Sequence, residues 1–268
     1  MDPYKKTMTS SHFSPRNPAA NATDLHAKAS PDFAAKLTET ENLLRRAATA
    51  FAPVSQASSL GAEDVVITHL INRLQLDIPV FVLETGALHT ETLALLERTQ
   101  AHSQTPIQVF RPAHASVMQF VRDKGQDAMY HSIELRKACC SVRKMEPLTR
   151  ALAGHRAWIT GLRQEQSNAR AEVPMQDDSE VTDSAANGKA SASVGLTKFN
   201  PLARWTWGDV WHYIAENQVD YNPLHDQFFP SIGCAPCTRA ISLGEEFRAG
   251  RWWWESDAAK ECGLHAKS

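Results

Sequence analysis

The chain has 268 residues, of which 43% are hydrophobic and 22% charged, an ordinary composition for a folded globular protein with one main domain plus appendages. Its formal net charge of -2 gives no overall attraction to nucleic acid or to an anionic membrane, so we expect neither as a partner. Any anionic ligand must therefore be held by a local group of cations.

The N-terminal part of the chain predicts a tail followed by a helix. Residues 1–29 are rich in Ser, Thr, Asn, Ala and Pro without a sustained apolar period, which indicates a disordered tail. Ser30 and Pro31 then resemble a helix cap and a first-turn proline, and apolar residues at helical spacing extend the predicted helix to about Ala50.

From Val54 onward, short apolar runs alternate with amphipathic helices, a pattern typical of a parallel α/β sheet. Gly161 ends one of these runs at the carboxyl edge of the sheet, where ligands usually bind, so the loop after it is a candidate ligand loop. The expected strands lie at 79–83, 107–110 and 157–160, and the expected helices at 63–74 and 90–100.

The second half of the chain predicts a surface excursion and one more helix. Residues 172–193 are acidic and then rich in Ala, Ser and Gly, which predicts a mobile excursion without secondary structure. Thr206 then caps a helix with an aromatic stripe that we assign to the core rather than to a cofactor site. The stripe contains Trp207, Val210, Trp211 and Ile214.

The compartment follows from the absence of targeting signals and from the cysteine count. No stretch approaches the roughly 20 apolar residues that span a bilayer, and the N-terminus lacks the apolar core of a signal peptide. We therefore expect a soluble, cytoplasmic protein. Because this compartment keeps thiols reduced, five cysteines favour metal binding and nucleophilic catalysis over a disulfide framework.

Two cysteine motifs carry the strongest chemical signal. Cys139 and Cys140 are adjacent, and Cys234 and Cys237 form a Cys-x-x-Cys turn about a hundred residues later. Adjacent cysteines on a helix diverge by about 100°, so they suit a bulky iron-sulfur cluster better than a compact zinc tetrahedron. The alternatives are thiols packed as small apolar groups and a redox disulfide between Cys234 and Cys237.

Cations surround the cysteine pair in the sequence. A cluster with four thiolates is net anionic, so nearby cations stabilise it and can also reach a substrate phosphate or sulfate. Lys144 is our candidate for this bridging position. For Arg136, Lys137 and Arg150 we favour a solvent-exposed helix face.

Two segments at strand ends are candidate ligand loops. Residues 58–64 follow a weak strand and open a helix, so their backbone amides could hold a phosphate or sulfate. Residues 83–86 end the next strand at the same edge, where a base and ribose could lie, although this tetrapeptide is more often an ordinary turn. The residues assigned are Ser58, Ser59, Gly61, Glu63, Asp64, Glu84, Thr85 and Gly86.

Arginines and tryptophans occur together near the C-terminus. Arg248 and Arg251 carry guanidinium forks that suit phosphate or sulfate, or they are merely solubilising. Three consecutive tryptophans at 252–254 cannot all face one core, which favours a partner or closure surface.

Cys262 is the fifth thiol, left over by the two cysteine motifs. Lys260 and His265 can favour its thiolate, and Gly263 gives the segment freedom to move, as a nucleophile would need. The alternative is a free surface cysteine without function.

These segments together resemble the assimilatory adenylyl-sulfate (APS) reductases, close relatives of the phosphoadenylyl-sulfate (PAPS) reductases. The match is collinear from about Ser58 to His265, with Leu60 where an aromatic residue is usual and Glu84 where Asp is usual. The chain is one residue short within 166–170, so Arg170 and Arg163 are both candidates for a substrate arginine. The matching segments are SSLGAED, LETGALHTET, KACCSVRKMEPL, ITGLRQEQS, KFNPL, GCAPCTRAI, RAGRWWWE and KECGLH.

The resemblance implies an adenine-nucleotide alpha hydrolase-like α/β fold, a parallel twisted sheet flanked by helices with a mobile C-terminal tail. It divides the chain into the tail at 1–29, a sulfonucleotide- and cluster-binding domain at 30–243, and a segment at 244–268 that carries the nucleophile. It implies a [4Fe-4S] cluster on Cys139, Cys140, Cys234 and Cys237, and substrate binding by Lys144, Gly161, Arg248, Arg251 and His265.

The implied reaction is reduction of APS to sulfite and AMP in sulfate assimilation, through an S-sulfocysteine on Cys262 that thioredoxin resolves. A homo-oligomer is compatible with the sequence. The alternatives are a PAPS reductase of the same family and a zinc-stabilised nucleotide- or RNA-binding module that lacks catalysis.

Overall fold

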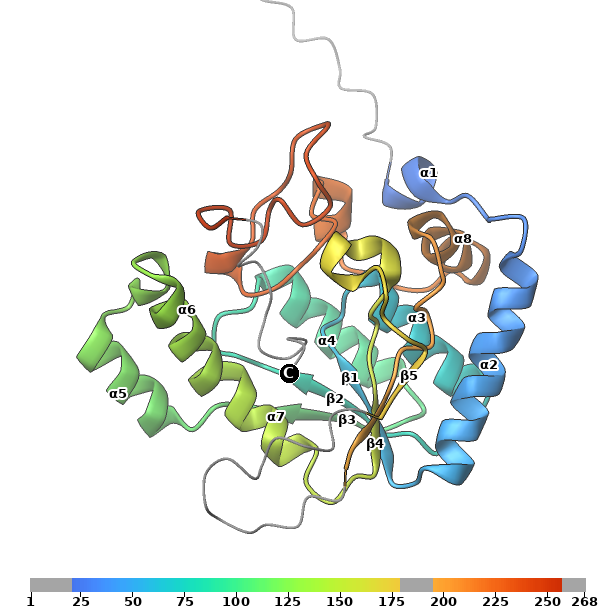
Figure 1. Cartoon of the computed structure of the whole chain (residues 1–268), viewed down its shortest axis with the longest axis horizontal. Coiled ribbons are helices and arrows are strands. Elements are labelled where there is room, and N and C mark those ends of the chain that lie inside the picture. The colour runs from blue at the N-terminus through green and yellow to red at the C-terminus, as the bar shows by residue number, and fades with distance from the viewer. Residues whose placement is uncertain (1–20, 179–194, 257–268) are drawn as a thin grey trace, which may run out of the picture.

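The computed structural model describes residues 21–178 and 195–256 of the chain, and within them a twisted sheet of six strands has helices on both faces (Figure 1). The strand order is β3-β2-β1-β4-β6-β5, and all neighbours are parallel except the antiparallel pair β5 and β6. The strands are β1 Val54–Ser58, β2 Val80–Leu83, β3 Ile107–Phe110, β4 Ala157–Ile159, β5 Gln176–Asp177 and β6 Thr197–Phe199.

The α-helices alternate with the parallel strands, as the sequence pattern predicts. A π-helical turn at Ser141–Met145 joins α6 directly to α7. None of the helices in the described part of the chain is both long and apolar enough to cross a bilayer. The helices are α1 Ala22–His26, α2 Phe33–Ala50, α3 Ala62–Arg73, α4 Thr90–His102, α5 His114–Lys124, α6 Ile133–Cys140, α7 Glu146–Ala151 and α8 Trp207–Asn217.

Alternate residues of the strands face two separate cores, because side chains of a strand point to opposite faces. On one face, Val82 and Ile159 pack with residues of α2, α3, α4 and α8. On the other face, Phe81 and Trp158 pack with Leu148 of α7, and α5 and α6 lie on the same side in Figure 1. Both faces of the sheet are thus covered, as a parallel sheet requires.

The strand order reverses between β1 and β4, because the chain proceeds from β1 outward to β3 on one side and from β4 outward on the other. In open parallel sheets, ligands bind beside the carboxyl ends of the strands at such a point. Gly161 follows β4 here, and a Cβ on this residue would lie 2.5 Å from Oδ1 of Asp64. The close approach of the two loops therefore requires glycine.

The predicted elements agree with the structure to within one or two residues over most of the sheet. The strand at 107–110 and the helix end at Ala50 are confirmed. The same helix begins at Phe33 rather than at Pro31, because tertiary contacts use the capping groups of Ser30. The Ser30 amide donates to Asp209, and its hydroxyl accepts from Lys36.

Two segments that we expected to lack structure contain regular elements. Within the predicted tail at 1–29, residues 22–26 form α1, because Asn21 caps the helix and the Ala22 amide donates to Asp226 at 2.7 Å. Within the predicted excursion at 172–193, the strand β5 pairs with β6. Residues 1–20 and 179–194 lie outside the described part of the chain.

Candidate functional site

A cavity of ≈ 190 Å³ opens at the carboxyl ends of β1, β2 and β4, at the point where the strand order reverses. Its floor is apolar and consists of Ala57, Phe81, Leu148 and Trp158. The remaining lining residues are both apolar and polar, and they include most of the predicted substrate residues. These are Ser58, Ser59, Gly61, Glu63, Asp64, Thr85, Lys144, Gly161, Arg170, Arg248 and Arg251.

The first turn of α3 presents the carboxylates of Glu63 and Asp64 to the cavity. Oδ2 of Asp64 accepts hydrogen bonds from the amide and the hydroxyl of Ser59, at 2.7 and 2.6 Å. Burial raises the pKa of Asp64 to about 6; these hydrogen bonds oppose the rise and the neighbouring Glu63 adds to it. Leu60 has a φ of 61° and is almost fully buried, so the turn is tight. The Ser59 amide is thus engaged by a carboxylate of the first turn of α3.

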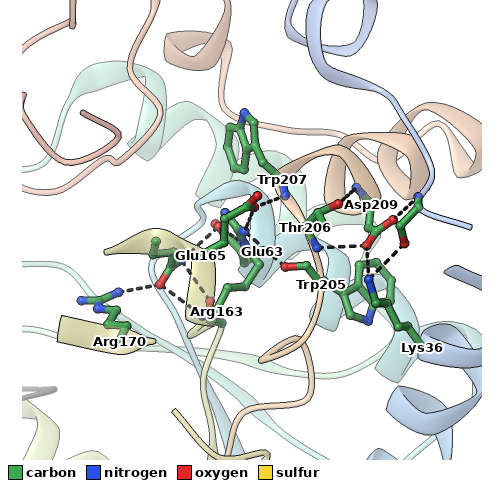
Figure 2. Close-up of polar contacts among 12 residues, drawn as sticks. Lys36, Glu63, Arg163, Glu165, Arg170, Trp205, Thr206, Trp207 and Asp209 are labelled. Carbon is green, nitrogen blue, oxygen red and sulfur yellow. Dashed lines mark hydrogen bonds and ion pairs between the residues drawn. The ribbon is translucent and has the colours of Figure 1, made fainter. Parts of the chain in front are cut away.

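Arg163 lies behind the cavity wall rather than in it. Figure 2 shows its guanidinium between Glu63 and Glu165, with Nε donating to Glu63 at 2.9 Å and Nη1 donating to Glu165 at 2.8 Å. The side chain is fully buried, and its guanidinium carbon lies 5.3 Å from the ring of Trp207. Arg163 therefore holds the wall together, and of the two candidate substrate arginines only Arg170 lines the cavity.

Gln166 connects these groups to Arg170. Its side-chain amide donates to Glu63 at 3.0 Å, and its Oε1 accepts from Nη1 of Arg170 at 2.6 Å. Arg170 is therefore oriented at the cavity wall by a chain of hydrogen bonds that begins at α3. Sequence reasoning did not identify Gln166.

The cysteine motifs meet on the other side of the cavity. Cys139, Cys234 and Cys237 share one buried apolar cluster with Met129 and Trp252. The neighbouring Cys140 is half-buried, and none of these four cysteines forms a disulfide. The structure thus brings together thiols from sequence positions about a hundred residues apart.

The Cys-x-x-Cys segment forms the predicted turn, with Cys234 preceding a short 3₁₀ helix at Ala235–Cys237. A Cβ at Gly233 would lie 2.5 Å from Nη2 of Arg251. The glycine therefore allows the cavity-lining guanidinium to lie directly beside the cysteine turn. The end of the cysteine turn is fixed as well, because the carbonyl oxygen of Cys237 accepts a hydrogen bond from the backbone N–H of Trp252 at 3.2 Å.

Cations and a hydroxyl group lie next to the thiols. Burial raises the pKa of Cys237 to about 11, and Lys144 and Arg251 act in the opposite direction. Because both cations also line the cavity, the predicted bridging position of Lys144 has geometric support. Thr85 places Oγ1 3.2 Å from Sγ of Cys234.

Arg143 is a cation beside the thiols to which we assigned no role. Its Nη1 donates to the carbonyl oxygen of Thr85 at 2.8 Å. Burial raises the pKa of Cys139, and Arg143 is the first of the groups that oppose this rise. The position of Arg143 one turn after Cys139 on the helix was the signal that could have identified it.

A single metal ion and a four-iron cluster make different demands on the donor residues. Across residues 21–178 and 195–256, no three His, Cys, Asp or Glu side chains converge in the geometry of a single-ion site. A four-iron cluster makes a different demand, because each thiolate binds a separate iron and the sulfurs lie further apart than around zinc. Thiols that form no disulfide, with cations next to them, fit such a cluster in donor type and in charge.

Arg136 is fully buried, and the expected solvent-exposed position is wrong for this residue. It binds Glu255 through two hydrogen bonds, from Nε at 2.9 Å and from Nη2 at 2.8 Å. Its guanidinium lies 4.5 Å from the ring of Trp252. The reason is helical spacing: Arg136 precedes Cys139 by three residues and shares its buried face. Lys137 and Arg150 are exposed, as predicted.

The tryptophan run divides between core and surface, which confirms that it cannot face one core. Trp252 is 1% exposed, Trp254 is half-buried, and Trp253 is 40% exposed. Tyr130 packs on Trp254 with ring centroids 4.5 Å apart, and its hydroxyl donates to the carbonyl of Pro236. An aromatic surface thus adjoins the cysteine turn.

Besides Arg163, two predicted positions lie away from the main cavity, and two lie outside the described residues. The Glu84 carboxylate accepts the amide of Gly86 at 2.6 Å and pairs with Arg111 at 3.1 Å, beside a separate depression. Glu84 and Gly86 therefore have the geometry of an ordinary turn, the alternative to a ligand loop at this strand end. Cys262 and His265 fall in the part of the chain that the structure does not describe.

A parallel sheet with a cavity at its switch point, an apolar floor and a cationic rim defines a nucleotide-binding α/β protein. Residues 53–240 match the model of the phosphoadenosine phosphosulfate reductase domain. This match spans more than half of the chain, and the chain therefore belongs to that family.

Similar relatives are named adenosine 5'-phosphosulfate reductase. The protein of Allochromatium vinosum is 51% identical over 211 residues, which cover 79% of this chain and 78% of the relative. That of Burkholderia cepacia is 46% identical over 235 residues, covering 88% of this chain and 89% of the relative. That of Neisseria meningitidis serogroup B is 50% identical over 210 residues, covering 78% and 80%.

Solved structures show the same fold. The phosphoadenylyl-sulfate reductase of Candida auris, in a phosphate complex, superimposes with a TM-score of 0.59 at 25% identity, covering 78% of this chain and 98% of that one. FMN adenylyltransferase of Candida glabrata with ATP has a TM-score of 0.51 at 12% identity, covering 90% and 81%. The expected adenine-nucleotide alpha hydrolase-like fold is confirmed.

Proposed function

We propose that this chain reduces adenosine 5'-phosphosulfate to sulfite and AMP in sulfate assimilation. The observation that carries the proposal is one cavity with an apolar floor for a base and a cationic end that continues into the thiol cluster. Lys144 and Arg251 belong to both parts. The names of the relatives support the same reaction.

The family also includes enzymes named for PAPS, which carries a further phosphate on the ribose. Asp64 favours the substrate without that phosphate, because a buried carboxylate in the cavity wall opposes a further anion. The Ser59 amide, which could have bound a phosphate, is engaged by Asp64. We therefore propose APS rather than PAPS as the substrate.

In the proposed reaction the Cys262 thiolate attacks the sulfur of APS, the S–O bond to the phosphate breaks, and AMP leaves. The sulfonate stays on Cys262 as S-sulfocysteine. Lys144, Arg248 and Arg251 offset the charge of the phosphosulfate and of the leaving phosphate. The assignment of Cys262 rests on the KECGLH motif.

A dithiol partner completes the proposed cycle. One partner thiolate attacks Sγ of Cys262, sulfite leaves, and a mixed disulfide remains. The second partner thiol then releases Cys262, so the partner is oxidised to a disulfide and supplies both electrons. Thioredoxin in the cytoplasm has this chemistry, and we propose it as the reductant.

We propose that Cys139, Cys140, Cys234 and Cys237 hold a [4Fe-4S] cluster. When bound, it would supply a covalent link between α6 and the Cys-x-x-Cys turn and a fixed charge beside Lys144. The two thiol steps already account for both electrons of the reduction. Membership of the reductase family gives no support to a zinc-stabilised module without catalysis; bound iron and acid-labile sulfide would exclude such a module directly.

The test uses the full chain with APS and without thioredoxin. We expect one AMP per active site and one sulfonate on the peptide that contains Cys262, because the thiol is consumed and cannot turn over without a second thiol. Mass spectrometry locates the sulfonate, and parallel reactions with PAPS should release much less nucleotide product.

The matched control is Cys262→Ser, which should retain iron and nucleotide binding but form no adduct, because a hydroxyl is a far poorer nucleophile than a thiolate. A sulfonate on another cysteine, or full sulfite production by the serine variant, would contradict the mechanism. Equal turnover of PAPS would contradict the assignment of the substrate.

A further inference from the structure

Gln166 lies between the first turn of α3 and Arg170, a cation of the cavity wall. It belongs to the short 3₁₀ helix at Gln164–Gln166 and is half-buried. Both Gln166 and Arg170 line the cavity. The reaction described above assigns no role to Gln166.

All four hydrogen-bonding positions of the Gln166 amide are occupied. Nε2 donates to Oε1 of Glu63 at 3.0 Å and to the carbonyl oxygen of Gly161 at 3.3 Å. Oε1 accepts from Nη1 of Arg170 at 2.6 Å and from the backbone N–H of Arg163 at 3.2 Å. Because a primary amide has two donor hydrogens and two acceptor lone pairs, these contacts use its full capacity. The amide therefore has one orientation, since a rotation by 180° would place its N–H groups against donors.

The donor side of this amide is held by a fixed group. Oε1 of Glu63 accepts from Gln166 and also from Nε of the buried Arg163, at 2.9 Å. Glu63 itself lies in the first turn of α3. Figure 2 shows Arg163, Glu63 and Arg170 together in this part of the wall. Gln166 thus connects the Arg170 guanidinium to a carboxylate whose position is set by a buried ion pair.

The neutrality of the amide matters for the charge of the cavity. A carboxylate at position 166 could also accept from Arg170, but it would add a negative charge where an anionic ligand has to bind. The amide of Gln166 orients the guanidinium without adding that charge. It also restricts a long side chain that would otherwise lose conformational freedom on binding a ligand.

We propose that Gln166 is a positioning residue that holds the Arg170 guanidinium in the orientation that binds the phosphosulfate group of APS. This inference rests on the proposed function, because it takes the cavity to be the APS site. Gln166 is assigned no contact with the reacting atoms. Its effect on the substrate passes through Arg170.

The test is a double-mutant cycle between Gln166 and Arg170 in the full-length chain. Calorimetric titration at pH 8 measures APS binding in the Cys262→Ser background, which forms no adduct. Gln166→Met keeps the length of the side chain but removes its four hydrogen bonds, and it should weaken APS binding about tenfold. Arg170→Met should weaken it by more than that. Adding Gln166→Met to Arg170→Met should then have no further effect, because the group that is positioned is already gone.

Two further measurements separate positioning from a general loss of structure. Adenosine, which lacks the phosphosulfate group, should bind all of these variants equally well. Gln166→Glu should weaken APS binding more than Gln166→Met does, because it adds a negative charge beside Arg170 and Glu63. If Gln166→Met does not fold, Gln166→Asn takes its place, since its amide is one methylene too short to keep these contacts.

Gln164 provides the matched control from the same 3₁₀ helix. Its Nε2 donates to the carbonyl oxygen of Val173 at 2.9 Å, and among the described residues it is not part of the cavity lining. Gln164→Met also removes a side-chain hydrogen bond from this segment. It should bind APS with the affinity of the parent protein.

Four results would overturn the inference: unchanged APS affinity in Gln166→Met, the same loss when Gln166→Met is added to Arg170→Met, an equal loss for APS and adenosine, or parental affinity in Gln166→Glu. Failure of the proposed function gives a different result. A chain that binds APS with the expected pattern but whose wild type does not reduce it would refute only the reaction. A chain that does not bind APS would refute both.

Discussion

The two walls of the cavity are held together in different ways. The sheet wall consists of the ends of β1, β2 and β4, whose positions follow from backbone hydrogen bonds between paired strands. The cysteine wall consists of α6, the π turn and residues 230–255. The last of these segments, residues 230–255, contains neither an α-helix nor a strand of the sheet. Figure 1 shows this C-terminal part, in orange and red, crossing beside α6.

Each wall contains one fully buried arginine, and the comparison shows what each wall depends on. Arg163 pairs with Glu63 of α3, whereas Arg136 pairs with Glu255 in the C-terminal part outside the sheet; the two pairs span 100 and 119 residues of sequence. The cysteine wall therefore depends on side-chain contacts and, in the proposed function, on the cluster that its thiols would hold. We expect it to be disturbed by changes that leave the sheet wall intact.

The largest effect should follow from breaking the thiol set. Cys234→Ser should lose its iron and visible absorbance, because a hydroxyl does not replace a thiolate ligand, while far-UV circular dichroism should still report the sheet. Cys139→Ser should behave in the same way, and Cys262→Ser provides the matched control with full iron. Full iron in both ligand variants would refute the assignment.

The next largest effect should come from the buried arginines. Arg136→Met and Arg163→Met should each lower the free energy of unfolding by about 3–5 kcal/mol, because each leaves a buried carboxylate without its partner. Only Arg136→Met should also weaken iron retention, since Glu255 lies on the cysteine wall. Urea titration and iron analysis measure the two effects.

The exposed pair of Arg150 with Glu146 provides the control for these variants. Arg150→Met should change stability by no more than about 1 kcal/mol. Equal iron loss in Arg136→Met and Arg163→Met would remove the proposed difference between the walls.

Lys144 lies where the walls meet, and its loss should affect the rate rather than the structure. We expect Lys144→Ala to retain iron and to form the sulfonate adduct about 10²-fold more slowly, a typical loss for one group that stabilises developing charge. Rapid-quench measurement of AMP release tests this. Lys137→Ala, on the exposed face of α6, should react at the wild-type rate; an unchanged rate for Lys144→Ala would make that residue a surface charge.

The smallest effects should distinguish two groups of the cavity by pH. The pKa of Asp64 is about 6 in the fold against its usual 3.8, so the folded state binds this proton more tightly than the unfolded state. The fold therefore loses stability as pH rises from 3.8 through about 6, and the loss is complete above that pH. The pKa of His225 is about 4 against its usual 6.5, so this side chain destabilises the fold as pH falls below 6.5.

Removing each group should therefore give stability changes of opposite sign. Relative to the wild type, Asp64→Asn should gain on the order of 1–2 kcal/mol between pH 5 and pH 7, and His225→Leu should lose a similar amount over the same rise. Denaturant titrations at both pH values measure these differences. The same sign for both variants would contradict the assigned charge states.

The sheet wall could be predicted from the sequence because its signals are local. Apolar runs gave the strand at 107–110, and the loops at 58–64 and Gly161 followed from where strands end. Helix α1 was missed because its amide contact is with Asp226, 204 residues away. Its sequence alone lacks the apolar face of a stable helix.

The cysteine wall was predictable in its thiols but not in its charges. Cysteine spacing is a strong signal, whereas an arginine is exposed in most proteins and only a distant carboxylate reveals a buried one. Arg136 and its partner Glu255 are such a pair.

The π turn at Ser141–Met145 sets the angular phase between the two walls. A π turn accommodates one residue more than a turn of α-helix, and one residue corresponds to about 100° of rotation. Leu148 on the cavity floor and Cys139 on the cysteine wall are therefore offset by this rotation. If the extra residue were removed, a continuous α-helix could form, but it would turn either the floor or the thiols away from the cavity. The π turn thus rotates α7 relative to α6, so that one continuous helical segment contributes residues to both walls.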